Sequence, residues 1–275
     1  MSTGKAVTFT AGLVQMRSGL SPQANLDAAV RLIEDAKSAG ADYVLTPEMT
    51  NILEIKRERL FATIAPEEND LTLAAMRELA RKLGIFLHVG SLAIKLLPEK
   101  AANRSFLIDR NGDIVARYDK IHMFDVELDG GESYRESRSY RPGEIGVAAD
   151  LPWGRLGLTI CYDLRFPALY RALAEAGCSF LAIPSAFTKQ TGEAQIVTNS
   201  KAEPAPRQVV QHGELARPVA PRLAIAFAVR QIDVEHVDLV VARDDLAARI
   251  NQEAAVGRLV DSGLYSQRAD VKMDR

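Results

Sequence analysis

The sequence predicts an α/β fold built on a mixed β-sheet, and three observations support that prediction. Short apolar segments alternate with segments whose apolar residues recur at helical spacing, which is typical of layered α/β proteins. A strand, an Asn-Gly pair and a second strand at 105–118 predict a hairpin, which makes the sheet mixed and not purely parallel. The chain has 275 residues, 47% of them hydrophobic, which suits one large α/β domain or two small ones.

The first two thirds of the chain contain clear element boundaries. A β-rich stretch at 7–14 precedes a helix that begins at Ser21-Pro22, with serine at the cap and proline in the first turn, and ends at Gly40. The elements expected next are a buried strand at 42–45, a helix at 71–83 followed by Gly84, a strand at 85–89, the hairpin at 105–118, a strand at 157–161, a helix at 167–176 and a strand at 180–183.

The last third has a weaker pattern. Proline-containing stretches at 202–206 and 218–221 interrupt regular structure. Between and after them we expect strands at 223–229 and 237–241, and a helix at 244–255.

Composition excludes several classes of function. The net charge of −2 gives no electrostatic reason to expect binding to nucleic acid or to an anionic membrane. No apolar run approaches the roughly 18–20 residues that span a bilayer, and the first residues lack a secretion signal. We therefore expect a cytoplasmic protein with two reduced thiols, Cys161 and Cys178. The four histidines have no metal-ligand spacing, so we expect no metal site.

Cys161 is the first candidate for catalysis, because it follows an apolar strand and precedes a turn and a helix. This arrangement places a nucleophile at the edge of a sheet, where the backbone N–H of Tyr162 can stabilise an oxyanion. A free cysteine has a pKa of about 8.5 and therefore needs a base or a nearby cation. A lone cysteine in such a place is more often a small core residue, which is what we expect of Cys178.

Three charged residues could supply the acid–base groups. Glu48 follows a buried strand, where a carboxylate can take the thiol proton and later activate water. Lys120 follows the second hairpin strand, where its ammonium can stabilise an oxyanion. Glu136 lies in a glycine-containing loop and could hold Lys120 or a substrate amide. Taken singly, each is more often a solvated charge.

Four motifs occur together and in order, and they carry a resemblance to a known family. The motifs are Leu45-Thr46-Pro47-Glu48, Tyr118–Asp125, Tyr134–Ser137 and Gly157–Pro167. From about Val7 to Thr188 the chain resembles the nitrilase superfamily of carbon–nitrogen hydrolases, and within it the Nit-type branch that contains omega-amidase and deaminated glutathione amidase. The resemblance implies a four-layer α-β-β-α sandwich that forms a homodimer. It also implies a single domain over 1–275, similar to the family over 1–193 and divergent over 194–275.

The resemblance also implies roles for individual residues. Glu48 would be the general base, Lys120 the oxyanion stabiliser, and Cys161 the nucleophile that is acylated. Glu136 matches the second glutamate of the family, and Arg165 matches an arginine that we expect to orient a substrate carboxylate. No cofactor is implied.

The expected reaction is hydrolysis of the C–N bond of a small carboxylate-bearing amide, to a carboxylate and ammonia, through a cysteine thioester. Other chemistry of the superfamily remains open, namely nitrile hydrolysis, N-carbamoyl hydrolysis and acyl transfer. A further alternative is an inactive relative, because residues 194–275 depart from the family pattern.

Overall fold

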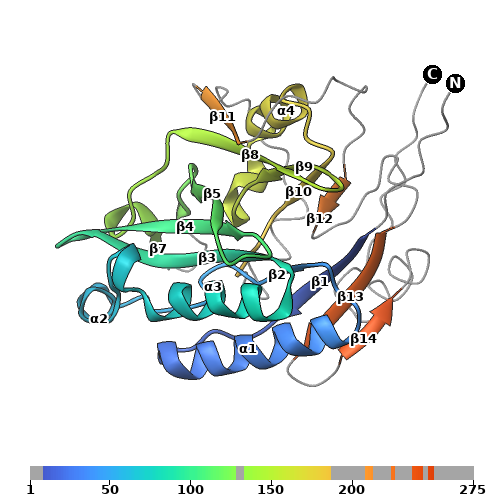
Figure 1. The fold of residues 1–275 in the computed structure, drawn as a ribbon. Coiled ribbons are helices and arrows are strands. Elements are labelled where there is room, and N and C mark those ends of the chain that lie inside the picture. Colours follow the sequence, from blue (N-terminus) through green and yellow to red (C-terminus); the bar gives the residue numbers. More distant parts are fainter. Residues whose placement is uncertain are drawn as a thin grey trace, which may run out of the picture.

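The computed structural model describes residues 9–127 and 133–186, together with the backbone of four later strands at 208–212, 224–226, 237–243 and 247–250. Two β-sheets are stacked face to face, and helices cover their outer faces (Figure 1). This arrangement confirms the predicted α-β-β-α sandwich.

The larger sheet has seven strands and carries two of the candidate site residues. Its central strands are parallel, and the antiparallel hairpin predicted around the Asn-Gly turn forms one edge. In spatial order the strands are β14 (Ala247–Ile250), β13 (Val237–Arg243), β1 (Phe9–Gln15), β2 (Tyr43–Leu45), β3 (Phe86–Leu97), β4 (Lys100–Ile108) and β5 (Ile114–Asp119).

The smaller sheet has five strands, and Cys161 follows one of them. In spatial order the strands are β11 (Gln208–His212), β8 (Ile145–Leu151), β9 (Gly154–Leu158), β10 (Phe180–Ala182) and β12 (Ala224–Ala226). Two short strands, β6 (Asp125–Glu127) and β7 (Ser133–Arg135), form a separate antiparallel ladder.

The helices end where local sequence signals place their ends. The Ser21 hydroxyl caps α1 (Pro22–Ser38), and the Asp70 carboxylate caps α3 (Leu71–Leu83), which ends at a left-handed Gly84 with φ 62°. Shorter helices are α2 (Arg57–Thr63), α4 (Pro167–Glu175) and the 3-10 turns η1 (Glu67–Asn69), η2 (Glu136–Arg138) and η3 (Cys161–Arg165). Within the described residues, no helix is long and apolar enough to cross a membrane.

The apolar core has separate layers. Helices α1 and α3 lie side by side on the outer face of the larger sheet, and α4 lies on the outer face of the smaller one (Figure 1). Cys178 belongs to the layer under α4 and is fully buried, as predicted for a core residue. The layer between the sheets contains apolar side chains from both, including Leu13, Tyr43, Tyr118, Leu156, Leu158 and Phe180.

Some predicted elements were wrong. Backbone pairing places 247–250 in strand β14, antiparallel to β13, whereas the sequence predicted a helix at 244–255; sheet pairing overrides the helix propensity of its alanines. Strand β9 ends at Leu158 and not at Cys161, because the Asp163 carboxylate takes the N–H of Ile160 and starts a turn. Strand β8 was not predicted, since its glycine and alanines have low β-propensity. The first predicted strand begins outside the described residues, at 7–8.

Candidate active site

The candidate residues follow strands of both sheets and meet between them. Glu48 lies three residues beyond β2, Lys120 directly follows β5, and Cys161 lies three residues beyond β9. The carbonyl ends of β2 and β5 lie at the same edge of the larger sheet, because β3 runs parallel to β2 and antiparallel pairing reverses the chain twice between β3 and β5. Glu48, Lys120 and Cys161 are all buried.

The backbone is left-handed at Cys161 and next to Glu48. Among the described non-glycine residues, only Met49 (φ 56°) and Cys161 (φ 48°) have positive φ. Hydrogen bonds hold both, from Met49 N–H to Ser91 Oγ at 2.9 Å and from Cys161 N–H to the Pro184 carbonyl at 2.9 Å. Such backbone conformations are sparsely populated, and they cluster at functional sites where the fold enforces them.

Lys120 joins the two glutamates. Its Nζ lies 2.9 Å from Glu48 Oε1 and 2.9 Å from Glu136 Oε2. Glu136 opens η2, and its Oε2 also accepts the backbone N–H of Phe124 at 2.7 Å. The sequence leaves open whether Glu136 holds Lys120 or a substrate amide, and in this structure its carboxylate binds Lys120.

The Glu48 carboxylate contacts the thiol as well as the ammonium. Oε2 accepts the backbone N–H of Ala186 at 3.0 Å, and the carboxylate makes a side-chain hydrogen bond with Cys161. Glu48 therefore lies between an ammonium and a thiol, within reach of the sulfur proton.

Electrostatics fix the resting charge of each group. Burial favours the neutral acid at Glu48, but the charge of Lys120 and the hydrogen bonds with Cys161, Lys120 and Asn103 together outweigh it and lower the pKa of Glu48. Burial also opposes the charge of Lys120, yet Glu48 and Glu136 raise its pKa well above the ordinary value. At Cys161, burial and the Glu48 charge raise the thiol pKa well above its usual range. The resting site therefore holds a carboxylate, an ammonium and a neutral thiol.

These charge states suit general-base activation of the thiol. Because burial disfavours the free thiolate, the sulfur must lose its proton as it attacks, and Glu48 is the ionised acceptor in contact with it. The N–H of Tyr162 lies in the first turn of η3, where helix geometry leaves N–H groups without an intrahelical partner. The arrangement can therefore supply a nucleophile, a base and cationic stabilisation of an oxyanion.

Sequence reasoning missed Asn103, a wholly buried residue of β4. Its Nδ2 donates to Glu48 Oε1 at 2.9 Å and to Glu136 Oε1 at 3.0 Å. No local pattern marks it, because its partners lie 55 and 33 positions away in the sequence.

Asp163 ties the turn at Cys161 to the segment that carries Lys120. Its carboxylate is fully buried and accepts the Ile160 N–H at 2.8 Å, the Tyr118 hydroxyl at 2.7 Å and the His122 N–H at 3.1 Å; His122 Nδ1 lies 2.7 Å from the same carboxylate. The sequence leaves open whether Asp163 and His122 are structural polar groups, and their contacts in the structure are of that kind.

Arg165 lies in η3 four residues after Cys161, and burial lowers the pKa of its guanidinium. Close to it in the sequence, the half-buried rings of Tyr162 and Phe166 form an aromatic cluster with Phe124. The ring of Tyr162 meets that of Phe124 edge-on at 5.1 Å and that of Phe166 at 5.5 Å. No described contact tests the predicted role of Arg165 toward a substrate carboxylate, which stays a prediction.

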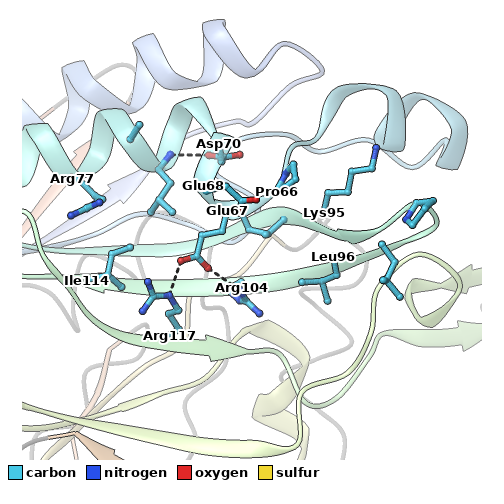
Figure 2. Close-up of a pocket in the computed structure, with 15 residues that line it drawn as sticks. Pro66, Glu67, Glu68, Asp70, Arg77, Lys95, Leu96, Arg104, Ile114 and Arg117 are labelled. Carbon is cyan, nitrogen blue, oxygen red and sulfur yellow. Dashed lines mark hydrogen bonds and ion pairs between the residues drawn. The ribbon is translucent and has the colours of Figure 1, made fainter.

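A groove of about 920 Å³ lies elsewhere, on the outer side of β3–β5 near the start of α3, and none of the candidate catalytic residues lines it. Figure 2 shows Glu67 in this groove, paired with both Arg104 and Arg117. Asp119 neutralises Arg104 further, at 2.6 Å. Arg104, Arg117, Glu67 and Asp119 thus form ion pairs with one another, which indicates a structural network.

Comparison with known proteins identifies the family. The carbon–nitrogen hydrolase family model matches residues 10–215, a span that includes all the candidate site residues. The chain belongs to the carbon–nitrogen hydrolase family. It is 40% identical over 217 residues to a deaminated glutathione amidase of Yersinia enterocolitica, covering 74% of this chain and 75% of that protein. It is 32% identical over 192 residues to an omega-amidase of Homo sapiens, covering 68% and 67%.

Solved structures of this carbon–nitrogen hydrolase's relatives agree in fold. The crystal structure of the C. elegans NitFhit protein matches with a TM-score of 0.62 at 27% identity, covering 95% of this chain and 65% of that one. An amidase from Nesterenkonia sp. matches with a TM-score of 0.58 at 21% identity, covering 91% and 86%, which supports the fold alone. The chain is thus a Nit-type member of the nitrilase superfamily and an enzyme of the C–N hydrolase class.

Proposed function

We propose that this carbon–nitrogen hydrolase is an amidase that converts a small carboxylate-bearing amide to a carboxylate and ammonia through a thioester on Cys161. The observation that carries the proposal is the contact of one ionised carboxylate, Glu48, with both a neutral thiol and a buried ammonium. The amidase names of the relatives support amide substrates.

The acylation step uses three groups. Glu48 accepts the Cys161 proton as the sulfur attacks the amide carbonyl, and Lys120 Nζ and the Tyr162 N–H stabilise the oxyanion. The C–N bond then breaks, and Glu48 returns the proton to the nitrogen, which leaves as ammonia.

The deacylation step reuses the base. Glu48 takes a proton from water, the resulting hydroxide attacks the thioester carbonyl, and the C–S bond breaks. The proton returns to the sulfur, so the site ends in its starting charge state. Glu136 holds the Lys120 ammonium throughout, and Arg165 orients the substrate carboxylate.

Ammonia release tests the proposal. The purified chain is incubated with α-keto acid amides and deaminated peptide amides, and ammonia is measured. We expect turnover that falls at least about 10³-fold in Cys161→Ala, because the nucleophile is lost. The control is Cys178→Ala, which should keep wild-type turnover because Cys178 lies in the core layer under α4. No ammonia from well-folded protein, or equal rates in Cys161→Ala, would refute the proposal.

Nitriles and N-carbamoyl amino acids are assayed in parallel, because the same four residues could serve those substrates. Faster turnover of either class than of amides would replace the amide assignment while keeping the thioester. The proposal also places the enzyme in the cytoplasm, and cell fractionation checks that compartment.

A further inference from the structure

Asn103 contacts both carboxylates of the site and the backbone of Lys120. Its side-chain Nδ2 donates to Glu48 at 2.9 Å and to Glu136 at 3.0 Å. Its backbone carbonyl accepts the N–H of Lys120 at 2.9 Å. One buried residue of β4 therefore bridges the two carboxylates and also fixes the backbone of the lysine between them.

The orientation of the Asn103 amide is determined by its partners. Both contacts of Nδ2 are carboxylate oxygens, so a flipped amide would set Oδ1 against two anionic acceptors. In the observed orientation Oδ1 is buried and has no hydrogen-bond partner among the described residues. The orientation that directs two N–H bonds at the glutamates therefore leaves the acceptor Oδ1 without a partner among the described residues.

A buried asparagine that contacts neither glutamate behaves differently. Asn25 in α1 uses both ends of its amide, accepting the Gly19 N–H at 2.8 Å and donating to the Gly19 and Asn51 carbonyls. Complete pairing is what a structural amide achieves. The incomplete pairing of Asn103 next to two carboxylates therefore points to a task in the site.

The task follows from charge. Glu48 Oε1 and Glu136 Oε1 both lie next to the Lys120 ammonium, at 2.9 Å and 3.2 Å, and one cation does not neutralise two carboxylates. The two N–H bonds of Asn103 go to the same two oxygens and reduce the repulsion that remains. They leave Glu48 Oε2 on the side of Ala186 and let the carboxylate meet the Cys161 thiol.

We propose that Asn103 is a positioning residue that fixes the two glutamate carboxylates of the amidase site relative to the nucleophile. The inference rests on the proposed function for its meaning in catalysis. The contacts of Asn103 also predict how fast the Cys161 sulfur reacts with an alkylating reagent, whatever the substrate is.

The positioning role of Asn103 predicts a change in the pH dependence of Cys161 reactivity. Glu48 is faced by Lys120 after β5, by Cys161 in η3, and by Asn103, while Glu136 and Tyr140 lie close by. The Asn103 bond lowers the pKa of Glu48, so removing it raises that pKa. Because the base works only when ionised, the acid limb of any Glu48-dependent rate should move to higher pH.

The experiment compares Asn103→Leu and Asn103→Ala with the control Asn25→Ala. Alkylation of Cys161 by iodoacetamide is followed from pH 4 to 9 by peptide mass spectrometry, with Cys178 as internal reference, and ammonia release from an amide is measured in parallel. We expect both Asn103 variants to lose about 10²-fold in turnover and in Cys161 alkylation near neutral pH. Their acid limbs should rise by roughly one pH unit. Asn25→Ala should lower the melting temperature but keep the wild-type pH profile.

The inference is overturned if folded Asn103 variants keep the wild-type pH profile and Cys161 alkylation rate. Their melting temperatures would then fall as in Asn25→Ala, which is the effect of a purely structural residue. If Asn103→Leu does not fold, Asn103→Ala, which adds no bulk, decides by the same two readouts. If the wild type releases no ammonia but the alkylation limb shifts, the proposed function fails and the positioning role stands.

Discussion

At Cys161 a residue with an ordinary side chain adopts a backbone conformation that usually needs glycine. The strain is balanced by fixed partners, the Pro184 carbonyl for its N–H and Asp163 for the preceding residue. The gain is a sulfur that faces Glu48 while burial keeps it protonated. Reactivity therefore depends on the placement of the base and not on a free thiolate.

Gly90 in β3 gives the segment before Glu48 the space it needs. A Cβ at this position would lie 2.0 Å from the Thr46 carbonyl oxygen and 2.6 Å from that of Pro47, both of them backbone atoms. We expect Gly90→Ala to lower the free energy of unfolding by about 1–3 kcal/mol and to reduce turnover, because the chain leading to Glu48 must move. Urea denaturation and ammonia release measure the two effects.

The matched control is Gly19→Ala, where the added Cβ meets only Asn25 Oδ1 at 3.8 Å, an ordinary contact. Both its stability and its turnover should equal those of the wild type. A Gly90→Ala enzyme that matches Gly19→Ala in both measurements would show that the close approach is unimportant.

At the scale of elements, the hairpin β4–β5 carries different groups on its two sides. Asn103 and Lys120 lie on the side of Glu48, the candidate base. Arg104 lies in the outer groove with Glu67 and Arg117 (Figure 2), and Asp119 pairs with Arg104 across the strands. The outer ion pairs hold the same strand ends that position the site.

We expect Arg104→Leu to destabilise the fold by roughly 2–3 kcal/mol, because it removes two bonds to Asp119 and one to Glu67 and leaves both acids partly buried without that partner. The midpoint of urea denaturation measures the effect, with an unchanged slope. The control Arg81→Leu, which removes an exposed pair with Glu78 on α3, should keep the wild-type midpoint. Equal midpoints in the two variants would contradict a structural role for the network.

Local signals predicted some elements well and others poorly. The Ser21 cap placed the start of α1 and Gly84 the end of α3, since they act through hydrogen bonds and backbone freedom that are local. The Asp70 cap of α3 was not identified from the sequence. Strand β8 and the strand at 247–250 each form a hairpin with the strand next to them in sequence, β9 and β13. Propensity alone missed them, because glycine and alanine are depleted in strands. The helix α2 has only seven residues, too few for a clear apolar period.

At the scale of the whole molecule, the order of strands in two facing sheets brings Glu48, Lys120, Glu136 and Cys161 together. Each residue could be named from the sequence, because its motif resembles that of a known family. Asn103 could not, since its importance lies in distances to side chains 55 and 33 positions away. The charge states of Glu48 and Cys161 could not be predicted from the sequence either, because they depend on burial and on neighbouring groups in the fold.

The resemblance predicts a homodimer through helices next to the active site. Helix α4 follows Cys161 closely, and Leu164 before it has 41% of its surface exposed. If this face is the dimer contact, Leu164→Asp should convert a dimer into a monomer, because it places a charge in an apolar interface. Light scattering on the eluting protein measures the mass, with Leu97→Asp, an exposed leucine in β3, as control. A wild type of monomer mass, or a Leu164→Asp dimer, would contradict this prediction.

The central claim is that the Cys161 sulfur carries the acyl group of the substrate. Acid quenching of the enzyme during turnover of a small carboxylate-bearing amide, followed by peptide mass spectrometry, tests it directly. We expect the mass of the acyl group, without its ammonia, on the peptide that contains Cys161, and none on the peptide that contains Cys178. Ammonia release that continues undiminished in Cys161→Ala, with no acyl mass on Cys161 in the wild type, would contradict it.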